Sequence, residues 1–294
     1  MTTLHELKKT FLPALAPEDF FILLAEATGK EKVFLLAHPE YELSTKEQEK
    51  AAQYLERRLK HESVASIVGH KEFYGREFRV TKDTLIPRPE TELLIERLLY
   101  KIATEQETTN GMVDIIDIGT GSGNIIITLA RETKILLPKN HIRFFALDIS
   151  SAALTVAEKN ATIQHVKESV TFLHSDLLKN FSPSPEKNRH CVIAANLPYL
   201  SIEIYNASDP DVRDYEPKSA LVSGHDGLDH YRRLLKELRK LLTRYISLTV
   251  FFEISPEQST LLKEIIQENF PQASLTLFQD LTGRDRLIQA TIKL

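Results

Sequence analysis

Apolar side chains follow two different spacings along this chain of 294 residues. In the first 60 residues they recur three or four positions apart, as at Phe20, Leu23, Leu24 and Ala27, and this spacing predicts helices. From about residue 113, short continuous apolar runs alternate with helical stretches, which indicates an α/β sheet. The expected N-terminal helices run from Leu4 to Leu12, from about Ala16 onward, and from Ser44, which begins a capping-box-like motif, to Lys60.

A short β segment is expected between these two patterns. Residues 78–80 and 85–86 could pair as a hairpin, with Lys82 and Asp83 at its turn. The expected boundaries are therefore a small helical domain over 1–72, a β-hairpin linker over 73–88 and a larger α/β domain over 89–294.

Four consecutive predicted strands end in a polar residue suited to a ligand. In open α/β sheets, ligands bind at the carboxyl ends of the strands. A single acid at such a place is more often a helix cap or a turn residue, whereas an ordered series predicts a binding site. The strands cover residues 113–118, 141–147, 170–174 and 191–195, and their polar residues are Asp117, Asp148, Asp176 and Asn196.

The first of these strands runs into a glycine-rich turn, Gly119-Thr120-Gly121-Ser122-Gly123, and then into an apolar helix. Such a turn is a weak signal alone, because NAD-binding folds use a similar one. Two details favour S-adenosylmethionine: the spacing is Gly-x-Gly-x-Gly, and the Asp117 carboxylate would attract a cationic ligand but repel a pyrophosphate. Asp148 is then placed to accept from ribose hydroxyls, and Asp176 to reach the adenine.

The tetrad Asn196-Leu197-Pro198-Tyr199 follows a buried strand and suits the binding of a planar nitrogen. An amide or aromatic amino nitrogen has a delocalised lone pair, so it needs two acceptors for its N–H groups and a flat surface against its face. The Asn196 side-chain oxygen and the Leu197 carbonyl can accept, and the Tyr199 ring can supply the surface. A plain Pro-Tyr turn after a strand explains the tetrad alone equally well.

With these motifs the chain resembles the HemK-type protein-(glutamine-N5) methyltransferases, and within them the release factor glutamine methyltransferases. The resemblance runs from about Gly69 to the C-terminus, and the first 60 or so residues match only in helical character. The segment Ile86-Pro87-Arg88-Pro89-Glu90-Thr91-Glu92 is its most specific part. Further matching motifs are Glu72-Phe73-Tyr74-Gly75, Asp226-Gly227-Leu228, Tyr231-Arg232 and Gly283-Arg284-Asp285-Arg286.

The resemblance implies a class I S-adenosylmethionine-dependent methyltransferase with a Rossmann-like seven-stranded sheet. It implies that residues 89–294 form the catalytic domain, and that residues 1–72 dock a protein substrate, the Gly-Gly-Gln loop of a peptide-chain release factor. The tetrad Asn196, Leu197, Pro198 and Tyr199 would then be catalytic and substrate-binding, and Leu177 would lie beside the adenine. The helical domain as a structural cover or dimer surface remains an alternative.

The chain departs from the family pattern at several positions. The family usually has proline at the position of Leu197, and the form with leucine is seen in ribosomal RNA adenine dimethyltransferases. Ser223 stands in place of a glycine, and the motif Glu-x-Gly-x-x-Gln reads Glu253-Ile254-Ser255-Pro256-Glu257-Gln258 here. These changes affect loop shape more than the expected reaction.

Composition excludes several other classes. The net charge is −4 and the pI about 6.2, which argues against affinity for a nucleic-acid backbone. No apolar run is long enough to span a membrane, no signal peptide is evident, and the single Cys191 fits a reducing compartment. We therefore expect a cytoplasmic, monomeric enzyme without a metal, without a membrane partner and without direct nucleic-acid binding.

The sequence thus predicts N5-methylation of a release-factor glutamine. Two alternatives remain at this point: an adenine-N6 methyltransferase acting on RNA or DNA, which the leucine of the tetrad favours, and a non-catalytic, cofactor-bound adaptor. The acidic balance and the segment from Ile86 to Glu92 count against the first, and the retained Asn196 and glycine turn count against the second.

Overall fold

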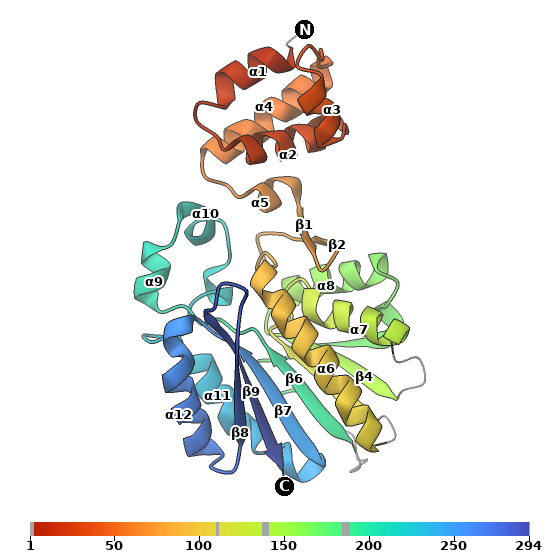
Figure 1. The fold of residues 1–294 in the computed structure, drawn as a ribbon, viewed down its shortest axis with the longest axis vertical. Coiled ribbons are helices and arrows are strands. Elements are labelled where there is room, and N and C mark those ends of the chain that lie inside the picture. Colours follow the sequence, from red (N-terminus) through yellow and green to blue (C-terminus); the bar gives the residue numbers. More distant parts are fainter. Residues whose placement is uncertain (1–2, 110–111, 137–140, 184–188, 294) are drawn as a thin grey trace. The chain divides into compact units, whose positions relative to one another are not determined.

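The computed structural model describes residues 3–109, 112–136, 141–183 and 189–293. The chain divides into two compact units, which we call the helical unit and the sheet unit (Figure 1). The helical unit holds Met1–His70 together with Ser208–Glu216, and the sheet unit holds Lys71–Ala207 together with Pro217–Leu294.

The helical unit contains the helices that the apolar spacing predicts and two short ones that it does not, α3 and α5. The capping box at Ser44 is confirmed, because Ser44 Oγ accepts from the Glu47 amide and the Glu47 carboxylate accepts from the Ser44 amide at 2.8 Å. Phe20, Leu24 and Leu55 are fully buried in its core. The helices are α1 Leu4–Phe11, α2 Pro17–Thr28, α3 Lys32–Ala37, α4 Thr45–Leu59 and α5 Val64–Val68.

A segment from the second half of the chain completes the helical unit. It contains the short helix α10, Pro210–Arg213. The Tyr215 hydroxyl donates to the Lys60 carbonyl at 2.7 Å, and the Arg58 guanidinium lies 4.0 Å from the Asp211 carboxylate. From the sequence we expect this segment in the α/β domain, because its packing partner Lys60 lies 155 residues away in the chain.

The sheet unit is built on a seven-stranded sheet in the order β5-β4-β3-β6-β7-β9-β8, as the sequence predicts. Strands β3 to β7 run parallel, and β9 is antiparallel to both β7 and β8. The strands are β3 Val113–Ile118, β4 Ile142–Asp148, β5 Val170–His174, β6 His190–Ala195, β7 Ser247–Glu253, β8 Ser274–Gln279 and β9 Asp285–Lys293.

The strand order reverses between β3 and β6. From β3 the chain proceeds outward to β4 and β5, and it then returns to place β6 on the other side of β3. Ligand sites of open parallel sheets form at such a reversal, because the loops that leave the two adjacent strands separate there. The turn after β3 begins at Gly119 and the loop after β6 begins at Asn196, so both predicted motifs border this point.

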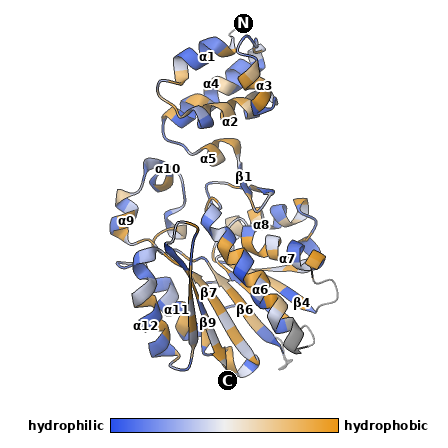
Figure 2. Cartoon of the chain, viewed as in Figure 1, coloured by the Kyte–Doolittle hydropathy of each residue, from blue (hydrophilic) through white to orange (hydrophobic). Residues whose placement is uncertain are grey.

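Two buried clusters cover the faces of the sheet. Alternate residues of β3 and β6 face opposite sides, so Ile116 and Ile193 pack with α11 and α12, whereas Ile115 and Val192 pack with α6 and α7. Hydrophobic residues, drawn in orange in Figure 2, predominate in β6 and β7, and all residues of these two strands are buried, as expected of strands covered on both faces. The helices are α6 Glu92–Thr109, α7 Asn124–Leu136, α8 Ser151–Ile163, α11 Asp229–Leu238 and α12 Ser259–Asn269.

The expected hairpin exists but lies earlier in the chain, so the pairing of residues 78–80 with 85–86 was wrong. The hairpin joins β1, His70–Phe73, to β2, Arg76–Arg79, through Tyr74 and Gly75. Residues 81–84 form a turn, in which the Thr84 amide donates to the Thr81 carbonyl at 3.0 Å. The two prolines that follow, at positions 87 and 89, lack the N–H groups that a strand ladder requires.

The polar segment from Ser201 to Asp226, expected as one long loop, contains the helix α9 Ile202–Ala207 as well as α10. Single-turn 3₁₀ helices occur at η1 Pro89–Thr91, η2 Lys167–Ser169, η3 Lys218–Ala220, η4 Leu242–Arg244 and η5 Pro256–Gln258. Within the part of the chain that the structure describes, every helix is too short or too polar to cross a bilayer.

Candidate active site

A cavity of about 230 Å³ lies within the sheet unit at the carboxyl ends of β3, β4 and β6. Its lining includes Gly119 after β3, Asp148 at the end of β4, Leu177 after β5 and Asn196 after β6. These are the strand ends at which the sequence predicts a ligand site. A smaller cavity of about 30 Å³ shares Gly119 and Asn196 with it and is also lined by Arg88, Thr91, Thr120 and Ser122. Most of the predicted residues thus surround two neighbouring cavities, but Asp117 and Tyr199 line neither of them.

The glycine turn is held against the neighbouring strand by main-chain hydrogen bonds. The amides of Gly119 and Thr120 both donate to the Leu147 carbonyl, at 2.8 and 2.9 Å. Gly119 has a φ of +73°, and a Cβ atom at this position would lie 3.2 Å from Leu197 Cδ2. A residue with a side chain would therefore be strained here and would also crowd the tetrad.

Asp117 lies behind this turn and lines neither cavity. Its carboxylate is fully buried, and Oδ2 accepts from the Thr120 hydroxyl at 2.6 Å. Burial raises the pKa of this carboxyl to about 7, and Oδ1 has no hydrogen-bond partner among the described residues. The predicted attraction between Asp117 and a cationic ligand stays a prediction.

Asp148 ends β4 and lines the larger cavity. Its Oδ2 accepts from the Gly121 amide at 2.9 Å and its Oδ1 from the Ser150 amide at 2.8 Å. Burial raises the pKa of the carboxyl, and the main-chain donors act in the opposite direction. These two bonds leave lone pairs that can accept from ribose hydroxyls.

Asp176 and Leu177 also line the larger cavity. The Asp176 carboxylate already binds Lys179 at 2.5 Å and Arg233 at 2.6 Å, and these two cations hold its pKa below the usual range. An adenine amino group would therefore compete with two charged donors for this side chain. Leu177 adopts a left-handed backbone, with a φ of +53°, and offers apolar surface, so the predicted adenine contacts stay predictions.

Asn196 follows the last residue of β6 and lines both cavities. Its Nδ2 donates to the Thr91 hydroxyl at 3.3 Å. Its Oδ1 is buried and has no hydrogen-bond partner among the described residues. An unpaired buried acceptor costs about 1–3 kcal/mol, and an N–H donor in either cavity could remove this cost.

The other tetrad residues differ in where they lie. Leu197 is buried, at 3% exposure, and Pro198 lines the larger cavity. Tyr199 is partly buried and lines neither cavity, so its role as the flat surface stays a prediction. Burial, followed by the nearby Glu253 carboxylate, raises the pKa of the Tyr199 phenol, which is therefore neutral at physiological pH.

A buried tyrosine fixes the strand ends that carry the tetrad. Tyr231 on α11 is fully buried, and its hydroxyl donates to the Glu253 carbonyl and lies 3.5 Å from the Ala195 carbonyl. The ends of β6 and β7 are thereby joined through one side chain, directly before Asn196.

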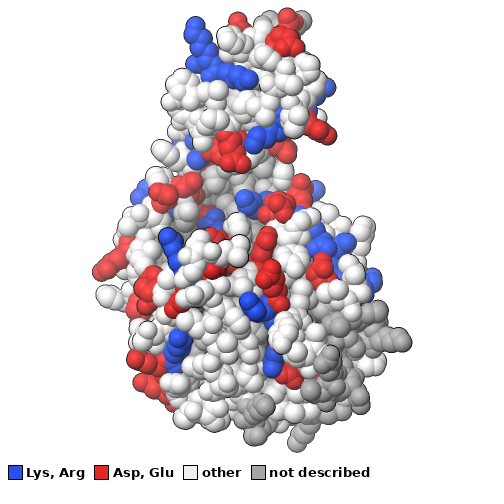
Figure 3. Space-filling model, in the orientation of Figure 1, with Lys and Arg blue, Asp and Glu red and all other residues white. Residues whose placement is uncertain are grey.

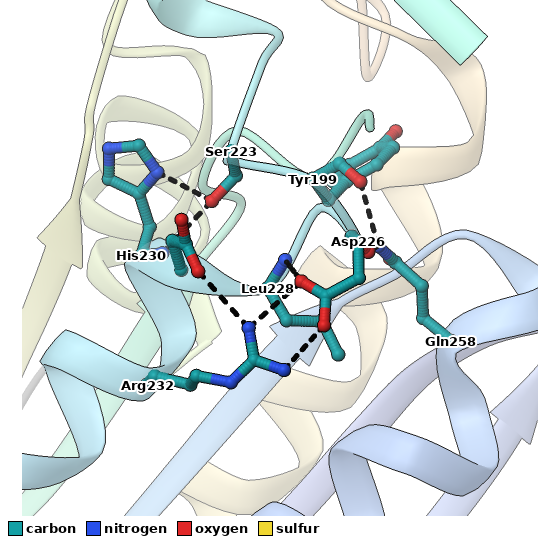
Figure 4. A network of polar contacts seen from close by, with 8 residues as sticks. Tyr199, Ser223, Asp226, Leu228, His230, Arg232 and Gln258 are labelled. Atoms are coloured by element: carbon teal, nitrogen blue, oxygen red, sulfur yellow. Dashed lines mark hydrogen bonds and ion pairs between the residues drawn. The ribbon is translucent and has the colours of Figure 1, made fainter. Parts of the chain in front are cut away.

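A second group of contacts holds the main chain at Tyr199 (Figure 4). The Gln258 side-chain amide donates to the Tyr199 carbonyl at 2.7 Å and to the Asp226 carbonyl at 3.0 Å. Gly227, with a φ of +78°, passes so close that a Cβ atom would lie 2.0 Å from the Tyr199 carbonyl oxygen. The Arg232 guanidinium binds the Asp226 carboxylate at 2.5 Å and anchors this loop to α11.

These contacts come from residues to which the sequence analysis gave no role: Thr91, Tyr231, Glu253 and Gln258. Thr91 and Tyr231 stand in motifs that carried the resemblance, whereas Glu253 and Gln258 stand in a motif where the chain departs from the family pattern; these motifs were the available signal. Among the described residues, no group of three or more His, Cys, Asp or Glu side chains could hold a metal ion.

The residues present fit S-adenosylmethionine. The Asp148 carboxylate, which suits the ribose, and apolar surface at Leu177 border one cavity together with the glycine turn. On the face of the molecule drawn in Figure 3, blue and red side chains are interspersed, without the continuous basic area typical of nucleic-acid binding.

Sequence comparisons match both parts of the chain to known families. Residues 4–69 match the PrmC N-terminal domain, and residues 110–273 match a methyltransferase domain. A release factor glutamine methyltransferase of Bacillus anthracis is 35% identical over 272 residues, which cover 92% of this chain and 91% of the relative. One of Bacillus subtilis is 35% identical over 271 residues, which cover 92% of this chain and 90% of the relative.

Solved structures agree on the fold. The catalytic domain of hMettl16 in complex with the MAT2A 3'UTR hairpin 1 superposes with a TM-score of 0.54 at 13% identity, over 81% of this chain and 80% of that one. The same domain in complex with hairpin 6 gives 0.53 at 16% identity, over 73% and 74%. At such identities the likeness shows the architecture of the sheet unit and no more.

Proposed function

This chain belongs to the family of release factor glutamine methyltransferases, and on that premise we propose that it transfers a methyl group from S-adenosylmethionine to the side-chain nitrogen of a glutamine in a peptide-chain release factor. The observation that carries the proposal is Asn196 Oδ1, a buried acceptor without a partner among the described residues, in a side chain that borders both cavities. A glutamine amide offers the N–H donor that this atom lacks.

The residues of the larger cavity have separable roles in this proposal. Asp148 would accept from the ribose hydroxyls, Leu177 would pack on the adenine, and the turn from Gly119 to Gly123 would lie beneath the methionine part. When bound, S-adenosylmethionine supplies an electrophilic methyl group on a sulfonium sulfur. The chain itself needs to provide no metal and no redox group.

The tetrad would position the substrate amide. Asn196 Oδ1 and the Leu197 carbonyl would each accept one N–H, and the Tyr199 ring would support the amide plane. The two acceptors fix the plane of the amide, so that the nitrogen lone pair points toward the methyl donor. Catalysis is then mainly positioning. A strong base is not required, because the nitrogen becomes acidic as the new bond forms and can release its proton to water.

We extend the proposal to the partner and the cellular place. The helical unit, which matches the PrmC N-terminal domain, would dock the release factor, and the methylated glutamine would be that of its Gly-Gly-Gln loop. The enzyme would act as a monomer in the cytoplasm, where release factors work. Light scattering of the purified protein, alone and with a release factor, measures whether it is a monomer.

The proposal is tested by methyl incorporation into a matched pair of substrates. A release factor and its variant with asparagine in place of the Gly-Gly-Gln glutamine are each incubated with the enzyme and S-adenosylmethionine carrying a labelled methyl group. We expect label in the first and none in the second. Equal label in both would place the methyl elsewhere and contradict the proposal.

A further inference from the structure

The Asn196 amide can face the cavity in either of two orientations, and only one of them suits the reaction. With Oδ1 toward the substrate, the side chain accepts from a glutamine N–H; with Nδ2 toward it, two donors would face each other. In the structure, Nδ2 faces the Thr91 hydroxyl at 3.3 Å and Oδ1 is left without a partner among the described residues. A contact that holds Nδ2 against Thr91 therefore also holds Oδ1 toward the substrate.

Thr91 is itself fixed by a buried carboxylate. Thr91 is 1% exposed and Glu253, the last residue of β7, is 2% exposed. The Thr91 side chain is hydrogen-bonded to the Glu253 carboxylate, and the other carboxylate oxygen, Oε2, has no partner among the described residues. Because an ionised carboxylate only accepts, the single hydroxyl proton of Thr91 must point to Glu253.

The direction of this first bond determines the direction of the second. Once its proton is used on Glu253, Thr91 can only accept from Asn196, and only Nδ2 can donate to it. We propose that Thr91 and Glu253 are positioning residues which, through this directional chain of hydrogen bonds, hold the Asn196 amide with Oδ1 toward the substrate. The inference rests on the proposed function, because it presumes that the substrate donates an N–H to Asn196.

Protonation of Glu253 would remove the fixed direction of the hydrogen bonds from Asn196 to Thr91 and from Thr91 to Glu253. A protonated carboxyl can donate to Thr91, whose own proton is then free to point at Asn196 and to favour the inverted amide. Burial raises the pKa of this carboxyl to about 7, with the hydrogen bond from Thr91 acting against it. The charged groups that face it are Arg286 on β9 and Arg88 and Glu90 at η1, and the phenols of Tyr199 and Tyr231 also lie near it.

The first test replaces Thr91 with valine, which keeps the shape of threonine but has no hydroxyl. We expect Thr91→Val to lower kcat roughly 10- to 100-fold through loss of orientation, with little change in KM for the release factor. Thr91→Ser keeps the hydroxyl and should restore kcat to within about threefold of the unmodified enzyme. Thr249→Val removes another fully buried threonine hydroxyl on β7, away from both cavities, and should leave kcat unchanged.

The second test measures the pH profile of Glu253→Gln, which cannot lose or gain a proton. If the ionised form is needed, kcat of the unmodified enzyme falls about tenfold between pH 8 and pH 6, because the pKa is about 7. The profile of Glu253→Gln should be flat over this range. Asp117→Asn removes the other buried carboxyl with a pKa near 7, and its kcat should still fall between pH 8 and pH 6.

A third readout does not depend on methyl transfer. A release factor with glutamate in place of the reactive glutamine presents a carboxylate, which two acceptors repel. The unmodified enzyme, saturated with S-adenosylhomocysteine, should bind it more weakly than the glutamine form. Thr91→Val should lose most of this discrimination, since its Asn196 amide is free to turn Nδ2 outward.

The outcomes separate the inference from the proposed function. An unmodified enzyme that methylates no glutamine contradicts the function and the inference together. An active enzyme whose Thr91→Val variant binds S-adenosylhomocysteine normally and keeps its kcat, or whose Thr91→Ser variant is as slow as Thr91→Val, contradicts the inference alone. If Thr91→Val does not fold, the dependence of kcat on pH in Glu253→Gln and Asp117→Asn decides. A kcat of Glu253→Gln that still falls between pH 8 and pH 6 overturns the inference.

Discussion

The two sides of the cavity hold their polar side chains in different ways. On the side of β4, both oxygens of Asp148 accept from main-chain amides, those of Gly121 and Ser150, which themselves line the cavity. On the side of β6, Asn196 depends on a threonine 105 residues away, which in turn depends on Glu253. The donors of the first arrangement belong to the backbone, whereas the second is made by side chains from separate segments.

This difference indicates where substitutions should act. Main-chain donors persist when a neighbouring side chain changes, so the Asp148 side should respond only to changes in Asp148 or the glycine turn. On the tetrad side, a change in a residue that touches no substrate should reach the reaction through Asn196 or through the main chain at Tyr199. Four predictions test this contrast, from the largest expected effect to the smallest.

Asn196→Ala should reduce kcat roughly 100- to 1,000-fold, because it removes a hydrogen-bond partner that is used in the transition state. Affinity for S-adenosylhomocysteine, measured by calorimetry, should change little. A variant that keeps its kcat and shows only a raised KM would assign Asn196 to simple binding and remove the basis of the contrast.

Gly227→Ala should destabilise the fold and slow the reaction together. Its Cβ atom would meet the Tyr199 carbonyl at 2.0 Å and Gln258 Nε2 at 2.4 Å. Gly283 is the matched control, since it has nearly the same φ, +79°, but open space around it. We expect Gly227→Ala to lose about 3 kcal/mol of unfolding free energy more than Gly283→Ala, measured by urea denaturation. Equal losses would mean that Gly227 responds only to backbone strain.

Asp148→Ala should act on cofactor affinity rather than on turnover. Loss of the ribose contacts should raise the Kd of S-adenosylhomocysteine roughly 10- to 100-fold, whereas kcat at saturating cofactor should stay within about threefold. Calorimetry and saturation kinetics measure the two quantities. An unchanged Kd would show that this carboxylate does not bind the cofactor.

Glu253→Gln should stabilise the protein above neutral pH. The folded-state pKa is raised from 4.5 to about 7, so between these values the folded state binds more protons than the unfolded state. Stability therefore falls as pH rises through this window, and the cost is fully present above pH 7. We expect the variant to gain roughly 3 kcal/mol relative to the unmodified protein on going from pH 4.5 to pH 8.

Chemical denaturation at the two pH values measures this difference. A pH-independent difference would show that folding does not shift the pKa of Glu253. That result would leave the orientation of Asn196 intact but would remove its expected dependence on pH.

Much of the site was readable from the sequence because its signals are local. The turn from Gly119 to Gly123, Asp148 and the tetrad each follow an apolar run directly, so the strand and its candidate site residue are read together. The supports of the tetrad were not readable in this way, since Gln258 lies 59 residues from its partner Tyr199 and Thr91 lies 105 residues from Asn196. No spacing rule links such positions.

The wrong hairpin has a similar cause. Residues 85 and 86 are apolar and β-prone, but the prolines at 87 and 89 remove donors, and the Thr81–Thr84 turn directs the chain elsewhere. Likewise, residues 208–216 carry a polar sequence with one proline that is typical of a loop, while their packing partners lie in the first 60 residues. Tertiary contacts decided both cases.

The most direct test of the central claim offers two substrates at once. The purified protein is incubated with methyl-labelled S-adenosylmethionine, a release factor and total RNA, and the position of the label is read by mass spectrometry, with Asn196→Ala as the inactive reference. The account predicts one methyl group, on the glutamine of the Gly-Gly-Gln loop, and its loss in the variant. A methyl group on RNA adenine, or on neither substrate, would contradict it.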